Sequence, residues 1–410
     1  MKRYKHSLSR GVVVMALLLS PVLMWADVIT DWNYITVTVT KRAGQNSNYA
    51  SRTEAVEAIA VYDAVNSITQ AGTPYHYFKH PNRPASAQAA VVQAAHDVLL
   101  AYFPEQKKYL DSLFTASIAG ITEPDIPVGL SVGKAAARDI IASRSDDALD
   151  PDQSYTPTST AVGQYRPTPT KFEPGVNKQW GHVRPFLIKG TDQFLPPAPP
   201  VVGSDEYKKA LAEVEKLGAK NSTARTREQT HTAQFYKQDA ELTVNEGARV
   251  LALAHPKPIT EEALIFALVD IAEADARIEV WAAKYKYLFW RPVTALNAGA
   301  DGSVTNNYEK WTPLINTPPH PSYPSGHSAT IDAGYDILIA FYGDNNAVEL
   351  HTTTTGEPAR VVKSLSKLEE ENGMSRIYGG IHFPFENTSA QEAGHKIASY
   401  VLANGPKLKK

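Results

Sequence analysis

The stretch NTPPHPSYPSGHSATIDAGYDILIAFY, residues 316–342, decides how the rest of the chain is interpreted. Its first half holds four prolines, a glycine and two histidines, a mixture unsuited to the interior of a helix or strand. From His327 onward, apolar residues recur at helical spacing. The stretch therefore predicts a stiff irregular segment that enters a helix near His327. A capped helix start is one interpretation; a helix start that holds an oxyanion is the other.

The core of this stretch is YPSGHS, residues 323–328. Pro324 fixes the approach, Ser325 offers a hydroxyl, and Gly326 lets a ligand come close to the backbone. His327 then lies in the first helical turn, where unpaired N–H groups and the helix dipole favour negative charge.

A second cluster, KYKYLFWRP, places Lys284 and Arg291 two helical turns apart. We expect both side chains to leave one helix face, and Pro292 to end that helix. Arginine supplies a planar fork of donors and lysine a point charge, a combination that suits a tetrahedral oxyanion. A solvated cationic face is the structural alternative.

A third cluster, MSRIYGGIHFPFEN, residues 374–387, holds Arg376 and His382 on either side of a glycine pair that forbids a regular helix. Asn387 is expected to cap the final helix. A lone histidine among apolar residues is often a core residue, but the neighbouring arginine favours a site. Together the three clusters supply enough donors to surround a phosphate-like anion, with one imidazole left for its central atom.

Most of the remaining chain predicts helix, so we expect an all-α fold. β-branched alternation is confined to short pieces such as VITDWNYITVTVT, residues 28–40. The amphipathic runs cover about 51–68, 86–103, 105–118, 128–143, 205–218, 228–253, 260–289, 326–342, 359–372 and 388–403.

The helical pattern breaks over about 145–203, which is rich in proline, threonine and glycine. Because Trp180, His182 and Phe186 would otherwise lie in water, we interpret this segment as a covering loop rather than a tether. The predicted organisation is an N-terminal helical half, 27–203, that includes the loop, and a C-terminal half, 204–410, that carries the anion site.

Residues 1–26 begin with a basic stretch, continue with an apolar run and end at Ala26, the layout of a secretory signal peptide. A retained anchor is the alternative. No other segment is long and apolar enough to span a bilayer. We therefore expect export to the periplasm or the extracellular space, without a membrane span in the mature chain.

The composition of the chain excludes some classes of function. The 410 residues are 43% hydrophobic and can bury a large core. Loss of residues 1–26, with four basic and no acidic side chains, would move the net charge from −2 to −6, so no basic excess favours nucleic acid. Cysteine is absent, and Met374 is the one methionine beyond residue 26, which suits a protein exposed to an oxidant.

The three motifs resemble the superfamily shared by type 2 phosphatidic acid phosphatases (PAP2), bacterial non-specific acid phosphatases and vanadium-dependent haloperoxidases. Its pattern is Lys-x6-Arg-Pro, then Pro-Ser-Gly-His, then Ser-Arg-x5-His-x3-Asp. The sequence matches it at 284–292, 324–327 and 375–382, and departs from it at Glu386, where the pattern has aspartate.

The haloperoxidase branch is the most similar, because YLFWRPVTAL, ASRTEAVEAIAVYDAVNSI and GQYRPTPTKF also resemble it. Lipid phosphatases of the superfamily cross the membrane several times, and the acid phosphatases are much shorter. The resemblance extends over about 30–404 and implies two four-helix-bundle halves.

This resemblance implies vanadate as the cofactor, with phosphate able to occupy the same site. His382 is the implied axial ligand of the metal and His327 the implied acid–base residue. Hydrogen peroxide and a halide would react to give hypohalous acid, with Lys284 polarising the bound peroxide. An organic acceptor would take the halogen. The residues implied to bind the vanadate oxygens are Lys284, Arg291, Ser325, Gly326 and Arg376.

Four further positions are implied to support the halide or the ligands. At position 320, where this chain has His320, bromide-preferring relatives also carry histidine and chloride-active ones carry phenylalanine. The histidine therefore favours bromide or iodide as the halide. A histidine in an exposed loop is the alternative interpretation. Trp290 precedes the motif arginine. Asp239 is a candidate brace for Arg376. Glu386 is expected to orient His382, provided that its longer side chain reaches the same ring nitrogen.

Two other functions stay open. In an acid phosphatase, His382 would attack the phosphorus of a phosphomonoester to form a phosphohistidine, and His327 would protonate the leaving alkoxide. An exported anion-binding protein without turnover is the third candidate. The two histidines argue against it, because binding needs neither a nucleophile nor an acid.

Overall fold

The computed structural model describes residues 27–147, 153–298 and 308–409; the predicted signal peptide lies outside them. Helices dominate this part of the chain, so the all-α prediction is confirmed. The α-helices are α1 (Val28–Arg42), α2 (Ser47–Thr69), α3 (Ala87–Tyr102), α4 (Lys107–Gly120), α5 (Ile126–Ser143), α6 (Asp205–Gly218), α7 (Arg227–Phe235), α8 (Ala240–Ala254), α9 (Ile259–Tyr287), α10 (Pro292–Asn297), α11 (Gly326–Tyr342), α12 (Leu365–Tyr378) and α13 (Pro384–Asn404). Two short 3₁₀ helices, η1 (Pro104–Gln106) and η2 (Lys178–His182), and an antiparallel strand pair, β1 (Val348–Leu350) and β2 (Arg360–Val362), complete the described elements.

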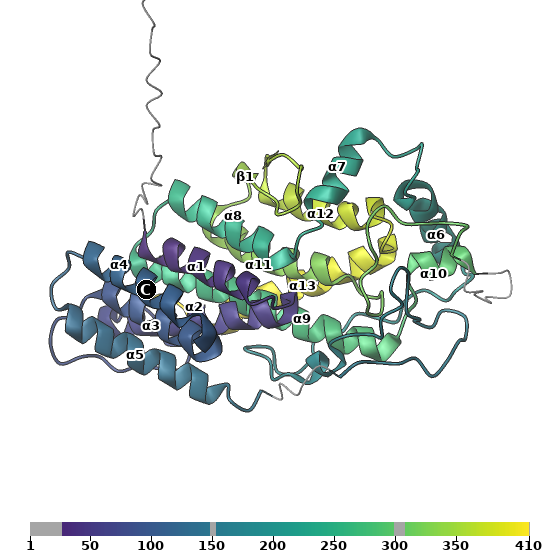
Figure 1. The fold of residues 1–410 in the computed structure, drawn as a ribbon. Helices are drawn as coiled ribbons and strands as arrows, with labels where there is room; N and C mark the ends of the chain where they lie inside the picture. Colours follow the sequence, from purple (N-terminus) through teal and green to yellow (C-terminus); the bar gives the residue numbers. More distant parts are fainter. Residues whose placement is uncertain (1–26, 148–152, 299–307, 410) are drawn as a thin grey trace, which may run out of the picture.

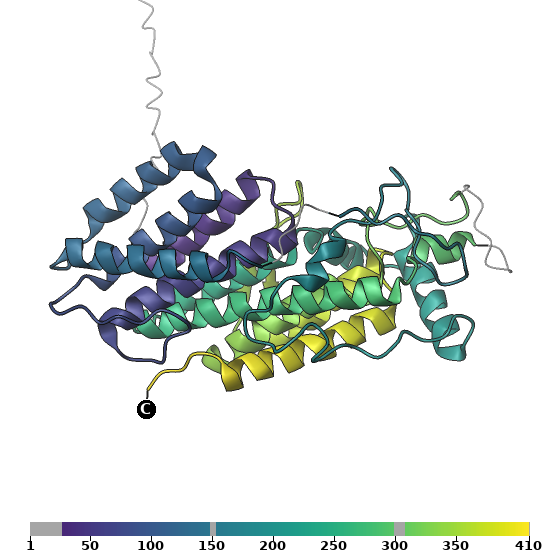
Figure 2. The ribbon, with the colours of Figure 1, turned by 90° about the horizontal axis from the view of Figure 1, so that it is seen from below.

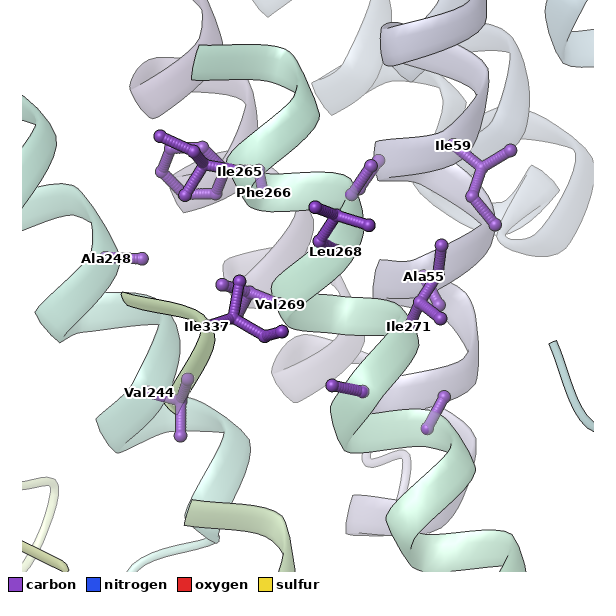
Figure 3. Packing of buried hydrophobic residues seen from close by; sticks show 14 of the residues in the cluster. Ala55, Ile59, Val244, Ala248, Ile265, Phe266, Leu268, Val269, Ile271 and Ile337 are labelled. Carbon is purple, nitrogen blue, oxygen red and sulfur yellow. The ribbon is translucent and has the colours of Figure 1, made fainter. Parts of the chain in front are cut away.

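The long helix α9 is the centre of the molecule. Helices α1 to α5 gather at one end, and α6, α7, α10 and α12 lie toward the other (Figures 1 and 2). Helix α9 packs against α2 on one side and against α8 and α11 on the other (Figure 3). Its buried residues cover the whole circumference, as expected of a helix enclosed by neighbours. None of the helices in the described residues is long and apolar enough to cross a membrane.

Residues 28–40, whose β-branched alternation is typical of a strand, form α1. Asp27 caps this helix by accepting hydrogen bonds from the backbone N–H groups of Ile29 (3.3 Å) and Thr30 (3.0 Å). Thr36 Oγ1 donates to the carbonyl of Trp32, which satisfies the hydroxyl inside the helix. Burial of Trp32 and its apolar neighbours outweighs the β propensity of the sequence.

Two other helix predictions need correction. The run 228–253 is not one helix but two, α7 and α8, with residues 236–239 between them. The run 359–372 begins too early, because residues 360–362 pair with β1 and α12 starts only at Leu365.

The segment 153–204 runs along the helices without regular structure, apart from η2 (Figure 2). Trp180 and Phe186 are buried, as expected of a covering loop, whereas His182 is exposed. Asp275 on α9 fastens this segment, because its carboxylate accepts the backbone N–H groups of residues 186, 187 and 188 at 2.6–2.9 Å. The division of the chain into two halves stays a prediction.

Candidate functional site

The start of α11 forms one wall of the candidate site. Ser325 is the N-cap, and its Oγ accepts hydrogen bonds from Ser328 N (3.4 Å) and Ser328 Oγ (2.9 Å). Gly326 opens the helix, as predicted, and a Cβ at this position would lie 3.1 Å from the Trp281 ring. His327 follows in the first turn. The unpaired N–H groups of this turn form a position that favours an anion.

Lys284 fixes the proline-rich approach to this helix. Its Nζ donates to the carbonyl oxygens of Pro321 (2.9 Å), Ser322 (2.9 Å) and Pro324 (2.5 Å), which engages all three ammonium donors. The side chain is fully buried. Burial first, and Arg291 second, lower the pKa of this lysine well below its usual value.

Arg291 reaches the same segment, but not from the helix that carries Lys284. Helix α9 ends at Tyr287, where Leu288 takes a left-handed conformation (φ 49°), and Arg291 is the N-cap of α10. The expectation that Pro292 ends the helix is therefore wrong, because Pro292 is the first residue of α10. Lys284 and Arg291 therefore do not share a helix face. The left-handed conformation of Leu288 ends α9 between them and lets Arg291 approach Lys284.

The guanidinium of Arg291 joins the second and third motifs. It donates from Nε to the carbonyl of His320 (3.0 Å) and from Nη1 to the carbonyl of Ile381 (2.9 Å). Nη1 also lies 3.1 Å from His382 Nε2, and Nη2 lies 3.0 Å from His320 Nδ1. Burial lowers the pKa of Arg291 to about 10.

Glu386 orients His382 despite its longer side chain. Glu386 Oε2 lies 2.6 Å from His382 Nδ1, and it also accepts from Ser322 Oγ (2.7 Å) and from the backbone N–H of Phe383 (3.0 Å). His382 lies just before the N-cap of α13 and Glu386 in its first turn, so a four-residue spacing brings them together. This contact places the proton on Nδ1 and leaves the lone pair of Nε2 for a ligand.

Arg376 and His327 are held by the break between α7 and α8. Arg376 donates from Nε to Ser375 Oγ (2.9 Å) and from Nη2 to the carbonyl of Tyr236. His327 Nε2 lies 2.9 Å from the carbonyl of Gln238, so it carries the proton and leaves Nδ1 as the basic atom. Burial lowers the pKa of Arg376 to about 9, and burial together with Arg376 lowers the pKa of His327 well below its usual value.

The two carbonyls that position these side chains, those of Tyr236 and Gln238, were not foreseen from the sequence. The signal for them is the polar interruption YKQD at 236–239, which the interpretation as one long helix concealed. The prediction that Asp239 braces Arg376 is wrong. The side chain of Asp239 is exposed and accepts from Ser47 Oγ (2.6 Å) at the start of α2 instead.

Titratable groups from all three clusters act on His382, which shows that the clusters lie close together. Burial lowers the pKa of His382 most, and Arg291, Lys284, His320 and Arg376 lower it further. Lys284, Arg291 and Arg376 are all buried, with relative exposures of 0–1%, whereas Glu386 is the carboxylate that interacts with His382. This excess of buried positive charge fits a bound anion, which would compensate it.

Three further predicted residues have different surroundings. The ring of His320 lies against Trp281 at a centroid separation of 5.1 Å and close to Arg291, so it is part of the site rather than an exposed loop residue. Trp290 is buried in a hydrophobic cluster with Tyr207 and Phe289. It packs among aromatic rings, not among the cations. Asn387 is not a cap but lies within α13, where its Oδ1 accepts from Ser328 Oγ at 2.5 Å.

Part of this chain matches a known protein family. Residues 264–408 match the family described as the VCPO second helical-bundle domain. Vanadium chloroperoxidase from Curvularia inaequalis is 27% identical over an alignment of 248 residues that covers 51% of this chain and 39% of that protein. The chain thus matches about two fifths of the length of that relative.

Solved structures with this fold include the first bacterial vanadium-dependent iodoperoxidase, with a TM-score of 0.79 and 22% identity over 92% of this chain and 96% of that one. The apo form of a bacterial vanadium-dependent chloroperoxidase has a TM-score of 0.70 and 16% identity, over 86% and 92% of the two chains. The resemblance seen in the motifs is confirmed: residues 264–408 match the second helical-bundle domain of the vanadium chloroperoxidase family model, and the chain has the fold of the solved vanadium-dependent haloperoxidases.

Proposed function

We propose that this protein is a vanadium-dependent haloperoxidase that oxidises a halide with hydrogen peroxide to hypohalous acid. One observation carries the proposal: the 2.6 Å contact of Glu386 with His382 Nδ1, which leaves the lone pair on His382 Nε2, beside Arg291 Nη1 (3.1 Å) and among three buried cations. A vanadium centre requires a neutral imidazole nitrogen of this kind, with its other nitrogen fixed by a carboxylate.

In this site the residues that would hold vanadate are His382 at the metal and Lys284, Arg291, Arg376 and the start of α11 around the oxygens. Vanadate, when bound, supplies a Lewis acid that polarises peroxide without changing its own oxidation state. The buried cations stabilise negative charge on the oxygens in a setting of low dielectric constant. Because its three donors already hold the carbonyls of 321, 322 and 324, Lys284 also keeps the rim of the site rigid.

His327 is the proposed acid–base residue. Its lowered pKa keeps the imidazole neutral near pH 7, and its Nε2–H is fixed on the carbonyl of Gln238. Nδ1 can therefore take up a proton from peroxide and return it to a departing oxygen.

The proposal also includes the preferred halide and the export of the protein. His320 lies beside Arg291, with its Nδ1 3.0 Å from Arg291 Nη2. The resemblance to bromide-preferring members of the family at this position supports bromide or iodide over chloride. Residues 1–26 have the layout of a signal peptide, which supports export.

The test is to incubate the purified protein with and without orthovanadate. Bromination of a dye with hydrogen peroxide and hydrolysis of a phenyl phosphate are then measured on the same samples. Bromination that requires vanadate is the expected result. Phosphate release that vanadate inhibits would replace the proposal by the acid phosphatase, and the absence of both activities would leave an anion-binding protein.

Variants of the two histidines assign the roles. His382→Ala should lose vanadate retention, whereas His327→Ala should retain vanadate and turn over about 10²–10⁴-fold more slowly. His182→Ala, an exposed histidine of the covering segment, is the matched control and should behave as the wild type. Equal vanadate retention by the two site variants would contradict the assignment.

A further inference from the structure

A second group of titratable side chains lies in the core, away from the anion site. Glu54 on α2 and Asp270 and Glu273 on α9 form this group, which we call the core triad. One carboxylate oxygen of each lies within 4.8 Å of the others, and all three residues have a relative exposure of 0%. Asp270 and Glu273 are three residues apart, so they share one face of α9.

The oxygens of the core triad are left without donors. Among the described residues, neither oxygen of Glu54, neither oxygen of Glu273 and not Oδ2 of Asp270 has a hydrogen-bond partner. Asp270 Oδ1 alone accepts a bond, from Asn245 Nδ2 at 3.1 Å. Buried carboxylates are almost always paired, so five unpartnered oxygens on three neighbouring carboxylates point to a missing ligand.

The surrounding charges do not compensate the core triad. Two further carboxylates, Glu57 and Glu241, are buried nearby and interact with it. Arg277 is committed to Glu241 (2.9 Å) and to Asn48 (3.3 Å), and Arg249 donates to Asn33 (2.6 Å). Five carboxylates against two guanidiniums leave an excess of negative charge in the core if all are ionised.

We propose that the core triad binds one Ca²⁺-sized divalent cation, which fastens α2 to α9. The donor set consists of oxygen atoms alone, as hard cations prefer. Oxygens that bind one calcium ion can be separated by at most about twice the Ca–O distance of roughly 2.4 Å, and the three oxygens of the triad, all within 4.8 Å of one another, are close enough to share one ion.

The position of the triad gives the ion a structural purpose. Helix α2 belongs to the helices at one end of the molecule and α9 to the centre (Figure 1). Ala55 on α2 and Ile271 on α9, each next to a member of the triad in sequence, belong to the apolar contact between these helices (Figure 3). An ion held by both helices would join them at a point where apolar packing is interrupted.

Protonation of the carboxylates is the competing explanation, because burial raises the pKa of Glu54 and Glu273 well above the usual value. The two explanations respond oppositely to glutamine. Glutamine has the size of a protonated glutamate but cannot replace an ionic ligand. The double substitution Glu54→Gln with Glu273→Gln therefore removes a cation site, whereas it would preserve a protonated core.

The experiment measures bound metal in the full chain after incubation with CaCl₂ a few degrees below the thermal transition, followed by gel filtration. The wild type should retain about one calcium ion per chain, and the double variant should retain none. Glu369→Gln is the matched control, because Glu369 belongs to a separate group with Asp336 and His395 and is also buried. Calcium lost in this control and kept in the double variant would overturn the proposal.

Thermal unfolding provides the second readout. Added CaCl₂ should raise the Tm of the wild type by about 5 °C relative to EDTA when the ion is in large excess over its Kd. The double variant should show no such shift. If the double variant does not fold, the wild type alone decides, since a calcium-free wild type with the same Tm in CaCl₂ and EDTA would overturn the proposal. None of these measurements depends on haloperoxidase activity.

Discussion

The substitution Glu386→Gln tests the central contact of the proposed site. Glutamine keeps the length of the side chain but removes its negative charge. In the wild type a single oxygen, Oε2, accepts from His382 Nδ1, Ser322 Oγ and the backbone N–H of Phe383. The neutral amide oxygen is a weaker acceptor, so His382 Nε2 becomes a poorer ligand.

The expected loss follows from the role of such carboxylates elsewhere. Removal of a partner that orients a metal-bound histidine weakens metal affinity by about 10–100-fold, which corresponds to roughly 1.4–2.7 kcal/mol. The loss should appear in vanadate affinity, because the cations that surround the oxygens are unchanged. At saturating vanadate, turnover should fall by a smaller factor.

Equilibrium dialysis against orthovanadate measures the affinity directly, at one pH and ionic strength for all variants. Glu392→Gln is the matched control, since Glu392 lies on the same helix but is exposed and paired with Lys396 at 2.6 Å. It should leave the Kd unchanged. If Glu386→Gln binds vanadate as tightly as the wild type, Glu386 does not tune the ligand, and the reasoning about His382 is wrong.

Three further predictions concern other parts of the molecule. Arg376→Lys should weaken vanadate binding by about 1.5–3 kcal/mol in the same dialysis, because a lysine cannot reproduce the paired donors; unchanged binding would contradict this. Gly133→Ala should cost about 1–3 kcal/mol in urea unfolding, since its Cβ would lie 2.3 Å from a carbonyl of α3, and an unchanged midpoint would show that the helices can separate there. The hydrogen bond to Asp336 raises the pKa of His395, so its stabilising contribution is present below about pH 6.5 and is lost as the pH rises through the folded-state value. The difference in Tm between wild type and His395→Gln should therefore be larger at about pH 5.5 than at about pH 8.5, and a difference that does not vary with pH would refute this assignment.

Local sequence rules predicted the helices well where neighbouring residues determine the structure. Gly326 at the start of α11 and the glycine pair after α12 lie where the sequence places them. The errors fall where distant residues decide. Residues 28–40 form a helix because Trp32 is buried in the core, and α9 ends at Tyr287 rather than at Pro292.

The sequence by itself determined which residues are candidates for the site, because the spacings within each motif are local and fix the order of donors. The tertiary structure alone decided how these residues are held. The contacts of Arg376 and His327 with the carbonyls of Tyr236 and Gln238 link segments far apart in the chain. The contact of Asp239 with Ser47, in place of Arg376, does the same. The core triad belongs to the same class, since nothing in the local pattern of α2 or α9 indicates that their carboxylates face one another. Such contacts depend on how the helices pack, and packing is a property of the whole chain.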